Sequence, residues 1–143
     1  NGNEICSNVK EFKDKRILWL SDSEPSVIIN SLLMLGYSES NKMHCHAVLL
    51  SHHGSAGNNS SELLKMIKSD RYIISSDGIN KHCLPNKKTI ARIINTASSL
   101  PVSLCFNYRD GRLGRMFKTD NSEEVRLMID LHYLGEGEAI EFL

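Results

Sequence analysis

Three short apolar runs in the first half of the chain each end abruptly in polar residues. A run of this length between turn signals is typical of a buried strand. Helix-like apolar spacing separates the runs, so the pattern predicts strand–helix units and an α/β fold with a mixed sheet. Because the carboxyl ends of parallel strands meet at one edge of a sheet, any chemistry is expected at that edge. The runs are Ile17–Leu20, which ends at Ser21-Asp22, Ala47–Leu50, which ends at Ser51-His52-His53, and Tyr72–Ile74, which ends at Ser75-Ser76-Asp77.

Proline, glycine and capping residues set the expected bounds of three helices. Pro25 stands where a first helical turn tolerates a missing N–H, and Gly36 ends the apolar pattern that follows. Asn58–Ser61 offers N-cap side chains for a second helix that ends near Asp70. A third helix is expected after Pro85, where isoleucines recur at helical spacing.

The second half of the chain is predicted to end in antiparallel hairpins. Val102–Phe106 forms a fourth apolar run, and Asp110-Gly111 is a hairpin-turn signal with Arg112–Lys118 as the returning strand. Apolar and polar residues alternate strictly over Val125–Tyr133, which favours a strand over a helix. A glycine-rich turn then leads into Ala139–Leu143.

Length and composition indicate one ordinary globular domain. The 143 residues suit a single core, and 41% hydrophobic with 24% charged residues exclude a disordered chain. Seventeen Lys and Arg balance seventeen Asp and Glu, so the net charge does not indicate a nucleic-acid binder. The sequence shows neither a membrane-spanning apolar run nor a signal peptide. Because the first residue is Asn, we expect a processed or truncated piece of a longer protein.

The four cysteines are widely scattered and form no CxxC pair. Without a secretory signal, they are interpreted as reduced thiols of a cytoplasmic protein. They are Cys6, Cys45, Cys83 and Cys105.

The adjacent histidines His52 and His53 are the strongest chemical signal. Imidazole is the commonest nitrogen ligand of zinc-like ions, and the following Gly54 lets the backbone turn sharply. Asp22 ends the preceding strand, so a carboxylate and imidazoles can meet across neighbouring strands. Such a set suits a hydrolytic metal site. From the spacing alone, surface or capping histidines remain an alternative.

The other four histidines are weaker candidates for a functional role. His44 and His46 precede an apolar strand and are predicted to be solvated. His132 falls on the outer face of its predicted strand and is interpreted as a surface residue. His82 lies in the loop after Asp77, where a substrate can reach it, and is a candidate catalytic residue.

Four segments, in this order and spacing, resemble the C-terminal half of metallo-β-lactamase-fold hydrolases. The nearest likeness is to the branch fused to DNA-uptake competence proteins. In that branch a strand ending in Gly-Asp precedes strands ending in His-His-Gly-Ser and in Ser, and a His-Pro comes before a helix. The resemblance covers residues 17–106 or so. Its segments are Leu18-Trp19-Leu20-Ser21-Asp22, Ala47 through Ser55, Tyr72-Ile73-Ile74-Ser75-Ser76 and Leu84-Pro85-Asn86.

The resemblance implies an αββα sandwich with a binuclear site, usually of zinc. Asp22 maps onto the strand-end Asp that bridges the two metals, and His52 or His53 onto the later metal-ligating His. His53 is favoured, because other branches place this ligand directly before the Gly. In the family, metal-bound hydroxide attacks a phosphoester, ester or amide.

The chain departs from the family pattern in two main ways. The motif His-x-His-x-Asp-His of the N-terminal half is absent, and His44-Cys45-His46 does not replace it because it follows Asp22. Leu84 stands where the family has His before the late Pro, and His82 lies two residues away. In addition, Ser21 stands where the family has Gly.

Residues 1–143 are therefore expected to form a single, partial metallo-β-lactamase-like domain without its N-terminal half. At most two ligands of the binuclear site are present, so the isolated chain is expected to be inactive. The expected partners are the missing half, a second copy bound through the uncovered sheet face, and a nucleic-acid or phosphoester substrate. One alternative is a non-catalytic metallo-hydrolase-like domain used for binding or regulation, and another is an unrelated α/β module with surface histidines.

Overall fold

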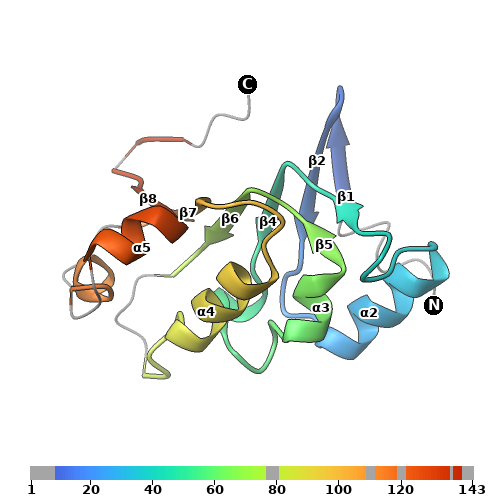
Figure 1. Cartoon of the computed structure of the whole chain (residues 1–143), viewed down its shortest axis with the longest axis horizontal. Coiled ribbons are helices and arrows are strands. Elements are labelled where there is room, and N and C mark those ends of the chain that lie inside the picture. The colour runs from blue at the N-terminus through green and yellow to red at the C-terminus, as the bar shows by residue number, and fades with distance from the viewer. Residues whose placement is uncertain (1–8, 77–80, 109–111, 119–121, 136, 140–143) are drawn as a thin grey trace.

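A six-stranded mixed sheet forms the centre of the computed structural model, which describes residues 9–76, 81–108, 112–118, 122–135 and 137–139. The strand order is β1-β2-β4-β6-β7-β8, which runs from right to left in Figure 1. Only β1 is antiparallel to its neighbour, whereas the other four pairs are parallel. The strands are β1 (Val9–Phe12), β2 (Lys15–Trp19), β4 (Ala47–Leu49), β6 (Arg71–Ile74), β7 (Val102–Phe106) and β8 (Ile129–Tyr133).

Four helices and two minor strands complete the described chain. The helices are α2 (Pro25–Met34), α3 (Ser61–Lys65), α4 (Lys87–Thr96) and α5 (Ser122–Met128). Strands β3 (Met43–His44) and β5 (Ile67–Lys68) form a separate parallel pair, and 3-10 turns cover Ser51–Gly54 and Leu113–Arg115. No helix in the described ranges is long and apolar enough to cross a membrane.

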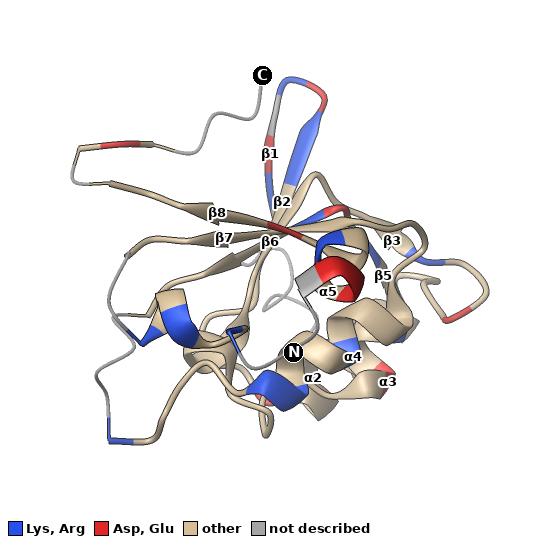
Figure 2. Ribbon diagram, turned by 60° about the vertical axis from the view of Figure 1, so that its left-hand side comes forward, with Lys and Arg blue, Asp and Glu red and all other residues tan. Residues whose placement is uncertain are grey.

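The strand order explains why the helices lie on one face of the sheet. From β2 onward each new strand of this sheet is added on the same side of the previous one, without a reversal. Right-handed crossovers then place every connecting helix on the same face. Figure 2 shows α2, α3 and α4 together below the sheet, and Val125 of α5 packs against the same core.

The helix-covered face carries the hydrophobic core. Leu18, Val48, Tyr72 and Leu104 are neighbours in the strand register, and each is at most 1% exposed. The buried helix residues that face this core are Ile28, Leu32, Leu63, Leu64, Ile90 and Ile93.

The opposite face of the sheet carries no helix of the described ranges; it is apolar around β2 and β4 and polar at β8, where Asp130 and His132 lie. Trp19, Leu49 and Ile73 are register neighbours on this face, and Trp19 is 51% exposed. Parallel strands are usually buried on both faces. A mixed sheet with helices on one face corresponds to half of an αββα sandwich, so the predicted fold class is confirmed.

The predicted strands and helix starts of the first half are confirmed within a few residues. Ser60 is the N-cap of α3, since its side chain accepts a hydrogen bond from the Leu63 N–H. The helix ends at Lys65 rather than near Asp70, because the chain turns into β5. The edge strand β1 was not predicted; charged residues such as Lys10 and Glu11 are typical of an edge strand.

The predicted C-terminal hairpins are wrong. Arg112–Lys118 contains a 3-10 turn instead of a strand, and the stretch predicted as one strand divides into α5 and β8. The strand β8 is parallel to β7 and needs a helical crossover, and acidic residues such as Glu123 in the first turn favour that helix. Asp110-Gly111 and most of Ala139–Leu143 lie outside the described residues.

Candidate functional site

The ends of β2 and β4 lie side by side at the carboxyl edge of the sheet. The hydrogen-bond ladder continues beyond the strands, since the Leu20 N–H donates to the Leu49 carbonyl at 3.1 Å. The His52 N–H then donates to the Ser21 carbonyl at 3.0 Å. Asp22 follows Ser21 and is exposed. The predicted adjacency of the Asp22 and histidine loops along neighbouring strands is therefore confirmed.

Three non-glycine residues in these two loops have left-handed backbone conformations. Their φ angles are 51° at Ser21, 45° at His52 and 56° at His53. This conformation costs an L-residue about 1–2 kcal/mol. Such outliers concentrate at functional sites.

The ring of His53 is oriented by a backbone carbonyl. Its Nδ1 is hydrogen-bonded to the carbonyl oxygen of Ser75, at the end of β6. Because a carbonyl only accepts, Nδ1 carries a proton, and in the neutral ring Nε2 then keeps its lone pair. Histidines that bind metals usually donate their other ring N–H in this way. The exposed ring of His52 has no such bond within the described ranges, so His53 is the better candidate ligand.

A buried asparagine organises the loop that carries the two histidines. The Asn59 side chain is fully buried, and its Oδ1 accepts the Ser51 N–H at 3.1 Å. Its Nδ2 donates to the carbonyls of Ser51 and Ser55, at 2.8 and 2.7 Å. This role was not predicted, because Asn58–Ser61 was interpreted only as a set of N-cap candidates.

The start of α4 clamps the same loop from the other side. Thr89 Oγ1 and the Asn86 N–H both donate to the Gly54 carbonyl, at 2.8 and 3.2 Å. The Asn86 Oδ1 in turn accepts the Ala56 N–H at 2.8 Å. Gly54 has φ +85°, and a Cβ there would lie 2.6 Å from the Cβ of Pro85. Glycine is therefore needed at this position for both conformation and space.

The end of β6 is held by side chains of later segments. The Ser76 N–H donates to Asn107 Oδ1 at 2.8 Å, and the Ser76 hydroxyl donates to the Leu84 carbonyl at 3.0 Å. The side chain of Leu84 is only 6% exposed. His82 is exposed and makes no hydrogen bond or ion pair with a residue of the described ranges. Its catalytic role stays a prediction.

The histidines at the amino edge of the sheet do not act alike. His44 is exposed, as predicted, but His46 is half-buried. The ring Nδ1 of His46 accepts the backbone N–H of Arg16 at 3.0 Å. The backbone N–H of His46 donates to the Arg16 carbonyl at 2.7 Å. His46 is thus a structural residue. His132 is exposed on β8, as predicted, with Nε2 2.9 Å from Asp130 Oδ2.

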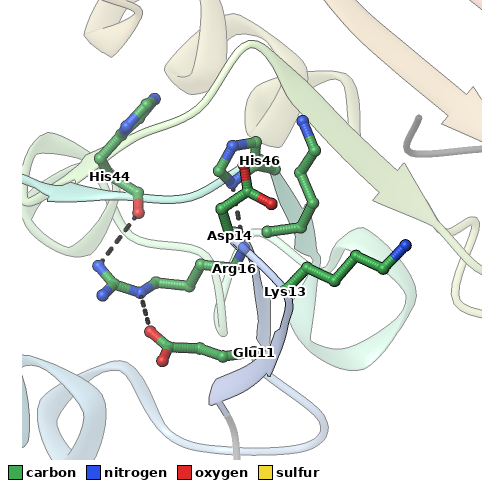
Figure 3. Close-up of a pocket in the computed structure, with 7 residues that line it drawn as sticks. Glu11, Lys13, Asp14, Arg16, His44 and His46 are labelled. Atoms are coloured by element: carbon green, nitrogen blue, oxygen red, sulfur yellow. Dashed lines mark hydrogen bonds and ion pairs between the residues drawn. The ribbon is translucent and has the colours of Figure 1, made fainter.

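A pocket of about 350 Å³ at this amino edge carries both charge signs (Figure 3). The Arg16 Nε donates to Glu11 Oε1 at 2.7 Å, so part of its charge is neutralised within the pocket. The lining residues are Glu11, Lys13, Asp14, Lys15, Arg16, His44 and His46. The pocket lies at the opposite end of the strands from Asp22 and His53.

The residues present fit only part of a metal site. Among the described residues, no three His, Cys, Asp or Glu side chains are grouped closely enough to hold a metal ion. A complete zinc site needs three or four protein ligands. Burial raises the pKa of the Cys45 thiol to about 12 and also raises that of Cys105, so neither offers a thiolate at neutral pH. Cys45, Cys83 and Cys105 are free thiols, and Cys6 lies outside the described residues.

Comparison of the chain with protein family models, curated proteins and solved structures found no match. The functional interpretation therefore depends on the geometry of the carboxyl edge. Its main features are the adjoining Asp22 and histidine loops, the left-handed turns and the oriented ring of His53.

Proposed function

We propose that this chain is the C-terminal part of a metal-dependent hydrolase of the metallo-β-lactamase superfamily. The complete protein would act in the cytoplasm on phosphoester or related bonds with two metal ions, usually zinc. The observation that carries the proposal is the hydrogen bond from His53 Nδ1 to the Ser75 carbonyl, next to the loop of Asp22. It leaves Nε2 as a free nitrogen donor at the edge of the sheet where ligands bind.

Asp22 and His53 are the proposed metal ligands, with His52 as the alternative histidine. When bound, the metal supplies an activated water and polarises the scissile bond. The chain contributes the fixed tautomer of His53 and the exposed carboxylate of Asp22. His82, exposed in the turn before Pro85, is the proposed proton donor or substrate contact.

The face of the sheet that no helix of the described ranges covers supports the proposal that a partner completes the domain. Ile17, Trp19, Leu49 and Ile73 form an apolar area on this face, whereas Asp130 and His132 make its β8 end polar. Burying it contributes about 25 cal/mol per Å². The missing N-terminal half is the proposed partner, and a second copy of the chain can replace it at high concentration. With only two ligands present, the isolated chain binds metal weakly and is inactive.

A second candidate is a non-catalytic domain with the same fold. The buried side chain of Leu84 favours it, since the resembling enzymes have a histidine at this position. An assay for metal-stimulated hydrolysis of a simple phosphodiester by the full-length protein separates the two candidates. Turnover that Asp22→Ala abolishes supports the enzyme, and absence of turnover with metal bound supports the non-catalytic domain.

The metal ligands can be tested on the chain itself by long-range ¹H–¹⁵N NMR of the histidine rings during Zn²⁺ titration. We expect the Nε2 signal of His53 to move while Nδ1 stays protonated. Asp22→Ala should weaken this response. Asp130→Ala is the matched control, because it also removes an exposed carboxylate beside a histidine, His132. If Zn²⁺ moves only the signals of His44 or His132, the proposed ligand set is wrong.

A further inference from the structure

Two adjoining pockets hollow the amino edge of the sheet, at the opposite end of the strands from Asp22. The first, of about 350 Å³, is the pocket in Figure 3, and the second has a volume of about 340 Å³. Both are lined by Lys15, His44 and His46, so we call the two together the amino-edge groove. The groove passes the starts of β2, β4, β6 and β7. The second pocket is completed by Cys45, Asp70, Arg71 and Ser103.

The ring of His46 presents a fixed hydrogen-bond donor to this groove. Its Nδ1 accepts the backbone N–H of Arg16 at 3.0 Å. In the neutral ring the proton is therefore on Nε2, which has no acceptor among the residues that the structure describes. His46 is half-buried, and a donor that loses water without gaining an acceptor costs free energy. An acceptor oxygen of a ligand in the groove would satisfy this donor.

One charge of each sign also lines the groove. Lys15 is half-buried and lines both pockets, whereas Asp14, in the turn between β1 and β2, lines the first. Within the described ranges neither side chain forms an ion pair or a hydrogen bond, and no ion pair joins the two. Arg16 differs, because its Nε donates to Glu11 Oε1 at 2.7 Å. Opposite charges around one space that do not pair with each other match a ligand that carries both charges.

The total charge of the groove argues against a polyanion as its ligand. Four basic residues and three carboxylates line it, which gives a net charge of +1 with neutral histidines. Surfaces that bind phosphate chains are dominated by basic residues. Asp14 lines one pocket and Asp70 the other, so a polyanion would meet a carboxylate in each. A small ligand with one positive and one negative group avoids this repulsion.

We propose that the amino-edge groove binds a small zwitterion with the chemistry of a free α-amino acid. The carboxylate of the ligand accepts hydrogen bonds from Lys15 Nζ and His46 Nε2, and its ammonium group lies against the carboxylate of Asp14. A pocket of about 350 Å³ is large enough for a ligand of this class. The inference goes beyond the proposed function, because it needs neither Asp22 nor a metal ion.

The test is a ¹H–¹⁵N NMR titration of the chain with alanine in EDTA. We expect saturable shifts at the residues that line the groove, with a Kd of about 1 mM. Propionate lacks the ammonium group and ethylamine lacks the carboxylate, so each should bind at least about tenfold more weakly.

Lys15→Met should weaken alanine binding at least about tenfold, because it removes a charged donor. Lys10→Met is the matched control, since Lys10 is an exposed lysine of β1 that does not line either pocket. It should change the Kd by less than about twofold.

His46→Asn tests the ring donor without removing the structural hydrogen bond. The asparagine Oδ1 can still accept the Arg16 N–H, but the Nε2–H is lost. We expect alanine binding to weaken about threefold to tenfold while the amide spectrum stays that of a folded chain. Asp14→Asn should lower the affinity for alanine to that for propionate, because the ammonium group loses its carboxylate.

The proposal is overturned if alanine gives no saturable shift up to about 20 mM, or if Lys15→Met and Lys10→Met have equal effects. Binding of propionate or inorganic phosphate as tight as that of alanine would also overturn it, because the groove would then be a general anion site. Shifts confined to the loops of Asp22 and His53 would place the ligand elsewhere, with the same consequence. Asp22→Ala should leave alanine binding unchanged, so a negative zinc titration does not affect this result.

Discussion

His53 and His46 lie at opposite edges of the same sheet, and each ring is fixed by a backbone group. At the carboxyl edge, Nδ1 of His53 is bonded to a carbonyl oxygen, so Nε2 keeps a lone pair. At the amino edge, Nδ1 of His46 accepts the Arg16 N–H, so its Nδ1 lone pair is already used. The backbone partner of the ring thus separates a candidate ligand from a structural acceptor, although both residues belong to one histidine-rich stretch.

The largest effect should come from the tight packing of the carboxyl edge. Gly54→Ala places a Cβ 2.6 Å from Pro85 and forces a left-handed alanine, so we expect a loss of about 3 kcal/mol of unfolding free energy. Gly36→Ala is the matched control, because it has φ +84° with nothing within 4 Å of the added Cβ. It should cost only about 1 kcal/mol in urea denaturation. Equal losses of stability in the two variants would mean that Pro85 moves away from the added Cβ at little cost in free energy.

The two histidines should separate stability from metal binding. His46→Ala leaves the Arg16 N–H without its acceptor and should cost about 1–3 kcal/mol. His46→Asn should restore part of this loss, since its Oδ1 can accept the same N–H. His53→Ala should cost less than about 1 kcal/mol but remove the Zn²⁺ response in NMR. A His46→Ala variant as stable as the parent would contradict the structural role.

The buried thiol of Cys45, at the amino edge, should make the stability of the chain depend on pH. Burial raises the pKa of Cys45 to about 12 in the folded chain, whereas the unfolded thiol has its ordinary pKa near 9.0. The unfolded state therefore loses its proton first, and stability should fall between pH 9.0 and about 12. Relative to Cys45→Ala, the parent should lose up to about 1.4 kcal/mol per pH unit in urea denaturation.

Thiol labelling provides an independent check that Cys45 is buried. The exposed Cys83 should react with a disulfide reagent at neutral pH, and the buried Cys45 should not. Rapid labelling of Cys45 in the native chain would show that the amino edge opens more readily than its burial indicates.

The smallest effect concerns the left-handed turn before Asp22. Ser21→Gly relieves the cost of φ 51° but adds backbone entropy to the unfolded chain, so we expect a gain of about 0.5–1 kcal/mol. Ser26→Gly, at an exposed position of α2, should instead lose about 0.5 kcal/mol. Thermal denaturation of the pair measures the difference. A loss in both variants would mean that the turn is not strained.

Much of the candidate site could be predicted because its signals are local. Apolar runs that end in Asp22 and in His52-His53 placed these residues at the edge of the sheet, and parallel pairing then made them neighbours. The choice of His53 over His52 could not be predicted from the residues alone, because it depends on the carbonyl of Ser75, more than twenty residues away. The Thr89 clamp was missed for the same reason, whereas the Asn59 clamp was missed because Asn58–Ser61 was interpreted only as a set of N-cap candidates.

The sequence by itself determined the elements whose signals lie within a few residues. Pro25 and Gly36 bound α2, and the apolar run of Val102–Phe106 coincides with β7. Such features depend on backbone conformation and local hydrophobicity, which neighbouring residues control.

Only the tertiary structure decided the direction of β8 and the role of His46. Val125–Tyr133 alternates like a strand, yet its first part is helical because a parallel β8 requires a crossover. The His46 ring acts as an acceptor only because the start of β2 lies beside it. These outcomes depend on contacts between residues far apart in the chain, whose free energies outweigh the weak local preferences of the segments involved.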